Sequence, residues 1–154
     1  MILKNKIAKI ATILPYKESY TIQHASAVSL WVSEFYENSI FKKNTFIYGN
    51  AKKGKFLTAN YKNIHLDNIK FKFKSTSSEY VEKLIKELNK INFDIVEIHN
   101  RPLILNKLLE KVKSNFIIYF HNDPLTMNGS KSIIERKKLI NNVSKIIFIS
   151  KWVK

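Results

Sequence analysis

The stretch that decides the fold is Phe116-Ile117-Ile118-Tyr119-Phe120-His121-Asn122-Asp123-Pro124. Its apolar and aromatic residues show no two-residue alternation, which is typical of a strand buried on both faces, as in a parallel sheet. Asn122 is a turn former and Pro124 prevents a regular continuation, so the strand stops here. We therefore expect His121 at the carboxyl end of a central strand, the edge where open α/β sheets bind ligands.

A second run repeats this design upstream. It reads Asp94-Ile95-Val96-Glu97-Ile98-His99-Asn100-Arg101-Pro102 and also passes from a buried strand to His, Asn and Pro. Pro102 suits the first turn of a following helix. Two strands that each end in a His-Asn pair should bring both pairs to the same edge of the sheet.

The rest of the chain alternates between strand and helix patterns. The predicted strands are Ile7–Leu14, Thr45–Tyr48, the half-exposed Ile69–Lys74, Ile95–Ile98, Phe116–Phe120 and Lys145–Ser150. The predicted helices are Ala25–Tyr36, Tyr80–Asn89, Leu103–Val112, Ile133–Val143 and one that begins at Lys151. Ala51–Asn68 is poorly periodic and is interpreted as an irregular excursion. This order predicts an α/β fold with a Rossmann-like, doubly wound parallel sheet.

Four of the strands, Ile7–Leu14, Ile95–His99, Phe116–His121 and Lys145–Ser150, are expected side by side near the sheet centre. In the first helix, Ala27, Leu30, Trp31 and Glu34 recur at helical spacing, and Trp31 and Phe35 are interpreted as core residues.

The composition suits one globular domain. The chain has 154 residues, 45% of them hydrophobic, and no cysteine, so disulfides and thiolate chemistry are excluded. The sequence has no apolar run long enough to span a membrane and no signal-peptide core at its N-terminus. We expect a cytoplasmic protein.

The net charge of +15 is the strongest bias in the composition. Only Arg101 and Arg136 are arginines and the other basic residues are lysines, whereas base readout favours arginine. The charge is interpreted as a solvated surface and nucleic acid is not expected as a partner. Contact with an anionic membrane or a phosphorylated lipid, at the inner face of the membrane, is a secondary expectation.

Several common sites are missing from the sequence. Neither a Walker-type loop nor a Gly-x-Gly-x-x-Gly fingerprint is present, which argues against a P-loop NTPase and an NAD enzyme. His99 and His121 have no third ligand at a zinc-binding spacing, so no metal is expected.

Three runs together resemble a known family. They are "LPYKESY…HASAVSLWV" near the start, "DIVEIHNRP", and "IIYFHNDP" followed by "ERKKLINNVSKIIFIS". In order and spacing they resemble the N-terminal domain of family 4 glycosyltransferases, which have the two-domain GT-B architecture. The His-Asn-Arg-Pro variant resembles bacterial members that act on surface polysaccharides such as lipopolysaccharide.

The resemblance implies a division of labour. Residues 1–154 would be the Rossmann-like, acceptor-side domain, and a C-terminal domain absent from this chain would bind the nucleotide-sugar donor. The implied reaction moves a sugar from that donor to a glycan or lipid-linked acceptor with retention of configuration. The nucleotide sugar is a co-substrate, and no cofactor or metal is implied. The chain alone is expected to show no transfer.

The resemblance also suggests roles for single residues. His121 matches a His near the donor sugar and, with Asp123, is the catalytic candidate. The substrate-binding candidates are Glu18, His24, His99, Asn100 and Arg101, with Glu18 and Asp123 placed to orient an acceptor hydroxyl. The family usually has a Gly pair after the first strand where this chain has Ala25 and Ser26, so close phosphate approach by that loop is not expected.

Each of these assignments has a structural alternative. His121 and His99 can serve to fix neighbouring loops, Arg101 to form a surface ion pair, and Asp123 to make a turn. For the whole chain, the alternatives are a non-catalytic glycan- or protein-binding module and, third, a basic nucleic-acid-binding domain.

Overall fold

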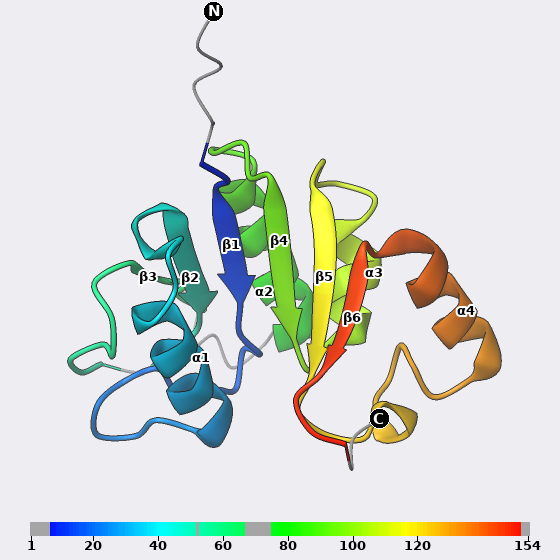
Figure 1. Ribbon diagram of the computed structural model, residues 1–154, viewed down its shortest axis with the longest axis horizontal. Helices are drawn as coiled ribbons and strands as arrows, with labels where there is room; N and C mark the ends of the chain where they lie inside the picture. The colour runs from blue at the N-terminus through cyan, green and yellow to red at the C-terminus, as the bar shows by residue number, and fades with distance from the viewer. Residues whose placement is uncertain (1–6, 52, 67–74, 152–154) are drawn as a thin grey trace, which may run out of the picture.

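A computed structural model describes residues 7–51, 53–66 and 75–151 of the protein. Its strands form one six-stranded, all-parallel sheet in the order β3-β2-β1-β4-β5-β6. The strand order reverses between β1 and β4, the arrangement of a doubly wound sheet (Figure 1). The predicted α/β, Rossmann-like fold class is confirmed.

The elements have the following bounds. The strands are β1 Ile10–Ile13, β2 Thr45–Gly49, β3 Tyr61–Asn63, β4 Ile95–His99, β5 Asn115–Phe120 and β6 Lys145–Phe148. The α-helices are α1 Ala27–Glu37, α2 Thr76–Leu88, α3 Pro102–Leu108 and α4 Ile133–Asn142. Short 3₁₀ turns, η1 and η2, cover Lys42–Asn44 and Pro124–Thr126.

The prediction that four strands lie side by side is confirmed, but the prediction that all four lie near the centre of the sheet is wrong. The strands β1, β4, β5 and β6 are neighbours, yet β6 is the outermost strand on its side of the described sheet. The first strand begins three residues later than predicted, because Lys9 pairs its backbone N–H with the Asp94 carboxylate.

The segment interpreted as irregular contains a strand. Tyr61–Asn63 pairs with β2 as β3, which corrects the prediction for Ala51–Asn68. Only three residues form β3, too few to give a periodic signal in the sequence. The predicted strand at Ile69–Lys74 lies outside the described residues, and so does the helix predicted to begin at Lys151, apart from Lys151 itself.

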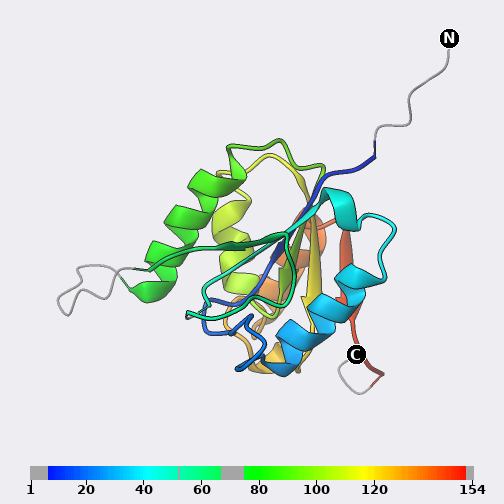
Figure 2. The same cartoon turned by 90° about the vertical axis from the view of Figure 1, so that its left-hand side faces the viewer.

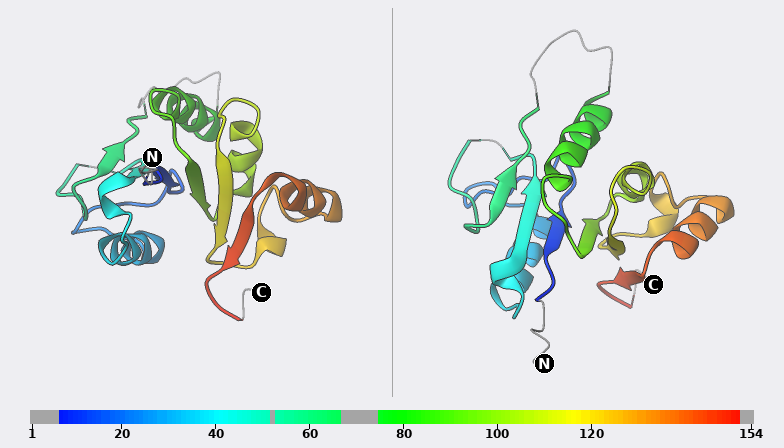
Figure 3. Two further views of the ribbon diagram at one scale, coloured as in Figure 1. Left: turned by 45° about the horizontal axis from the view of Figure 1, so that its top comes forward. Right: turned by 90° about the horizontal axis from the view of Figure 1, so that it is seen from above.

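Helices cover the two faces of the sheet unequally. Helices α2 and α3 pack on one face, where they share a core with alternate residues of β1, β4 and β5 such as Ile13, Ile98 and Ile118. Helix α1 lies on the opposite face, and a smaller apolar cluster joins it to β2 and β3 (Figures 1 and 3). In Figure 2 α1 and α2 lie on either side of the sheet.

The buried stripe of α1 differs from the predicted one. Val28, Val32 and Tyr36 face the sheet, whereas Leu30 and Phe35 are about half exposed. The prediction that Phe35 is a core residue is wrong. Phe35 stacks on Trp31, and the Trp31 ring in turn lies 5.8 Å from the Tyr119 ring of β5.

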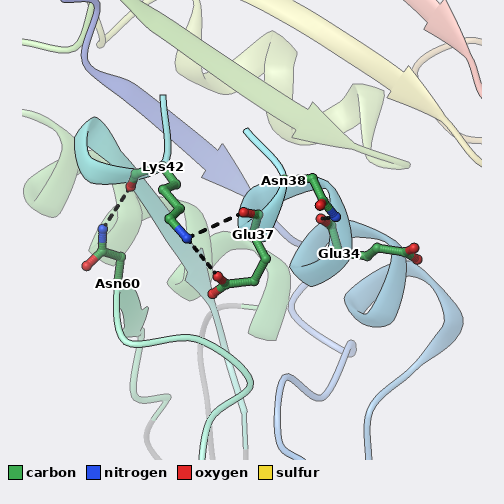
Figure 4. A network of polar contacts seen from close by, with 5 residues as sticks. All are labelled: Glu34, Glu37, Asn38, Lys42 and Asn60. Atoms are coloured by element: carbon green, nitrogen blue, oxygen red, sulfur yellow. Dashed lines mark hydrogen bonds and ion pairs between the residues drawn. The ribbon is translucent and has the colours of Figure 1, made fainter. Parts of the chain in front are cut away.

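Polar contacts fix the C-terminal end of α1 (Figure 4). Lys42 forms an ion pair with Glu37 at 3.2 Å, and the Asn38 side-chain amide donates to the Glu34 carbonyl at 2.9 Å. The Asn60 amide donates to the Lys42 carbonyl and so ties this corner to the chain before β3. These exposed contacts add little stability singly, but they define where α1 ends.

The packing of α3 yields a matched pair of substitutions. Leu105 is fully buried and Leu103, two residues earlier on the same helix, is 43% exposed. Leu105→Ala should lower the free energy of unfolding by about 2–5 kcal/mol, since it removes buried methyl groups and leaves a cavity. Leu103→Ala should change it by less than about 1 kcal/mol. Urea unfolding of both variants measures the difference, and equal effects would contradict this packing.

Candidate functional site

Two histidines meet at the carboxyl edge of the sheet. His99 is the last residue of β4 and His121 directly follows β5, and these strands are hydrogen-bonded neighbours. The Nδ1 atom of His99 and the Nε2 atom of His121 are 2.8 Å apart, a hydrogen bond in which one ring donates and the other accepts. We call these two residues the histidine pair. The sequence prediction that they converge is confirmed.

Aromatic rings enclose the histidine pair. The His99 ring stacks on Tyr119 with a centroid separation of 4.7 Å and an interplanar angle of 8°. Trp31 of α1 meets His121 edge-on at 5.1 Å. Trp31 is therefore a wall of the site, which gives this helix residue a place beyond the core role predicted from sequence.

Asn100 fixes the geometry between the two strand ends. Its φ of +54° is the only positive value among the described non-glycine residues, and asparagine tolerates this left-handed conformation better than most residues. Its side-chain oxygen accepts from the backbone N–H of His121 at 2.8 Å and of Asn122 at 3.3 Å. Its own N–H donates to the Tyr119 carbonyl. Asn100 is 3% exposed, so it positions His121 instead of offering its oxygen to a ligand.

Burial keeps both histidines neutral. It lowers the pKa of His121 from 6.5 to about 4. Burial has the larger effect on His99 and the proximity of His121 the smaller one, and together they lower the pKa of His99 well below its usual range. An imidazole with so low a pKa is a weak base at neutral pH, so it suits hydrogen bonding better than proton abstraction.

Each ring has one nitrogen left over. His121 is partly exposed and its Nδ1 makes no hydrogen bond to another described residue. His99 is 1% exposed, and its Nε2 is buried without a partner among the described residues. The pair thus offers one nitrogen toward the outer edge and leaves a second unsatisfied inside the protein.

A buried carboxyl lies two residues before His99. Glu97 Oε2 accepts from the Thr12 hydroxyl at 2.8 Å, and Oε1 accepts from the Tyr119 hydroxyl at 3.2 Å. Burial raises the pKa of Glu97, although both hydrogen bonds oppose the change. The network links β1, β4 and β5 across the sheet on the face that carries α1.

The other candidates at this edge make local contacts. The Arg101 guanidinium donates to the Asn100 carbonyl at 3.1 Å and lies at the start of α3. The Asp123 carboxylate accepts from the Leu125 N–H at 2.8 Å and so caps the turn η2. This contact matches the structural alternative for Asp123, a turn.

His24 lies in a different depression. A hollow of about 1120 Å³ separates the β1–α1 loop from the chain between β2 and the end of β3, and its lining includes Tyr16, Lys17, Ser19, His24, Asn50, Lys53, Phe56, Asn63 and His65. We call it the basic hollow. The bridge between Thr21 and Phe56 and the stacking of Tyr20 on Tyr61 hold its two sides together. Glu18 is partly buried in the same loop but is not among the lining residues. The substrate-binding candidate His24 is thus not brought together with His99 and His121.

Sequence reasoning missed Trp31 as a wall of the site and also missed Glu97, Tyr119 and Thr12. The one signal available was Glu97, an ionisable residue within an otherwise apolar strand run. The contributions of Trp31 and Thr12 depend on which strands are neighbours, which no local pattern in the sequence gives.

Further observations bear on the class of protein. Within the described ranges, no group of three or more His, Cys, Asp or Glu side chains is arranged to hold a metal ion. None of the helices in the described part of the chain is both long and apolar enough to cross a lipid bilayer. No protein-family model matches the chain, and a search of curated proteins finds no significant relative. The fold and site define a Rossmann-like α/β domain with a carboxyl-edge histidine pair.

The histidine pair predicts how stability depends on pH. The folded protein keeps His121 neutral down to about pH 4, whereas the unfolded chain takes up this proton near pH 6.5. Between these two pH values the unfolded state therefore binds more protons than the folded state. The contribution of His121 to folding stability is complete above pH 6.5 and is lost as the pH falls toward 4. Allowing for partial exposure, His121 should account for about 1–2 kcal/mol of this loss.

The measurement compares urea unfolding between pH 7 and pH 4 for the wild type and His121→Gln. Glutamine can still hydrogen-bond His99 but does not titrate, so the variant should lose less stability on acidification. His65→Gln is the matched control, since His65 is exposed, and it should follow the wild-type profile. A His121→Gln profile parallel to that of the wild type would show that His121 is not held neutral.

Proposed function

We propose that this chain is the acceptor-side domain of a nucleotide-sugar-dependent glycosyltransferase, with a glycan or lipid-linked acceptor. The observation that carries the proposal is the neutral histidine pair at the carboxyl edge, next to the point where the strand order reverses. The resemblance of the three sequence runs to the N-terminal domain of family 4 glycosyltransferases supports the same reading. Donor binding belongs to a second domain in that family.

The chemistry of the pair suits a sugar hydroxyl. A neutral imidazole presents one donor and one acceptor nitrogen, and a hydroxyl can pair with either. His121 Nδ1 is free of described partners, while Asn100 holds the backbone N–H of His121 and Trp31 packs against its ring. His121 therefore orients a hydroxyl of donor or acceptor, which contributes through positioning and not through proton transfer.

The basic hollow suits the acceptor. It combines aromatic surfaces from Tyr16 and Phe56, on which sugar rings can pack, with the amides of Asn50 and Asn63. Lysine and histidine side chains join them, and no Asp or Glu is among the described residues that line it. An acceptor with a phosphate or carboxylate group fits this charge, as does contact with an anionic membrane surface in the cytoplasm.

A second candidate function is a non-catalytic glycan-binding module. Ala25 and Ser26 favour it, because their side chains stand where the glycosyltransferase family has a Gly pair that lets the backbone approach a phosphate. In this case the basic hollow and the histidine pair would bind a glycan without any transfer.

The test is an activity assay of the polypeptide, together with any domain that its gene adds, against a panel of nucleotide sugars and glycan acceptors. Release of the nucleoside diphosphate and labelling of the acceptor are the readouts. We expect turnover from the complete gene product and none from the 154-residue chain alone. His121→Ala should lower kcat/KM roughly 10- to 100-fold, since it removes one positioned hydrogen bond in the transition state.

Asn115→Ala is the matched control, because Asn115 is the first residue of β5 and so lies at the amino end of the strand that His121 follows. It should leave kcat/KM within about twofold of the wild type. Glycan binding without turnover in the complete gene product favours the module. A loss in His121→Ala that unfolding fully explains would refute the role given to His121.

A further inference from the structure

A second pocket lies beneath α1, separate from the basic hollow. It measures about 200 Å³ and runs between α1 and the face of the sheet that carries Glu97 and His99. We call it the α1 pocket. Side chains from β1, β2, β4, β5 and α1 line it, with Trp31, Phe35 and Tyr119 among its aromatic walls. It shares no lining residue with the basic hollow.

One end of the α1 pocket is polar and incompletely satisfied. His99 lines it, and the buried Nε2 of His99 has no partner among the described residues. A buried ring nitrogen without a hydrogen bond is unfavourable, so a ligand group that supplies the bond is held more tightly than one that does not. Glu97 lies nearby, but both of its oxygens already accept hydrogen bonds from Thr12 and Tyr119.

The tautomers of the histidine pair determine whether a ligand group at His99 Nε2 has to donate or accept a hydrogen bond. When His99 Nδ1 donates to His121, His99 Nε2 is an acceptor, and in the opposite tautomers it is a donor. A hydroxyl satisfies both cases because it donates and accepts. A charged group is disfavoured, because no Lys or Arg is among the described residues that line the pocket and the remaining walls are mostly apolar.

The volume and the lining of the α1 pocket indicate what carries the hydroxyl group. A cavity of about 150 Å³ with apolar walls is known to hold benzene, so a pocket of this volume accommodates one substituted six-membered ring. Aromatic walls favour an aromatic guest through stacked and edge-on contacts. Trp31 and Phe35 already stack on each other at 5.2 Å along this wall.

We propose that the α1 pocket is a binding site for a small, uncharged aromatic molecule with a hydroxyl group, which hydrogen-bonds His99 Nε2. The site does not depend on the proposed glycosyl transfer, because the pair uses His99 Nδ1 and the pocket uses Nε2.

The experiment is an NMR titration of the 154-residue chain with phenol, benzene and benzoate as probes. Phenol should bind saturably, with an affinity in the millimolar range or tighter for a ligand of this size. Benzene should bind at least about fivefold more weakly, since it lacks the hydrogen bond, and benzoate should not bind there. Intermolecular NOEs should join the phenol ring to Trp31 and Tyr119.

A pair of substitutions on α1 gives the control. Val32 faces the pocket, and Leu30, two residues earlier, is 52% exposed and outside it. Val32→Phe should weaken phenol binding at least tenfold by filling the space, and Leu30→Phe should leave it unchanged. If Val32→Phe does not fold, the wild-type NOEs decide. The proposal is wrong if phenol does not saturate, binds no better than benzene, or shows its NOEs at the basic hollow.

Discussion

The site depends on the hydrogen bonds that Asn100 makes to the backbone after β5. The register of β4 and β5 places His99 opposite Tyr119, and the chain then has to turn away from both strands. The left-handed Asn100 makes that turn, and its side-chain oxygen holds the N–H groups of His121 and Asn122. These hydrogen bonds fix the backbone of His121 relative to β4 and so place its ring beside His99.

A neutral pair is the chemical consequence of this arrangement. Two imidazoles in contact and largely buried do not both carry charge readily. Neither ring has a carboxylate partner among the described residues, and burial is the dominant influence on each pKa. Two lysines, Lys17 and Lys53, lie instead around the basic hollow. The neutral histidine pair and the lysines of the basic hollow thus belong to separate parts of the structure.

The central strands and their histidines could be predicted because the signal is local. Phe116–Phe120 and Ile95–Ile98 are continuous apolar runs with clear stop residues, and this is enough to place His121 and His99 at one edge. The strand β3, the rotation of α1 that exposes Phe35, and the buried role of Asn100 depend on pairing and packing between distant residues. Sequence periodicity does not specify such contacts, so the division into two pockets was not predictable.

The central claim is that His99 and His121 form a neutral, hydrogen-bonded pair at the carboxyl edge. A long-range ¹H–¹⁵N spectrum of the histidine side chains at about pH 6 tests it most directly, since it reports which ring nitrogens carry protons. We predict two neutral rings with one proton between His99 Nδ1 and His121 Nε2. An imidazolium signal from either residue at this pH, or protons on both facing nitrogens, would contradict it.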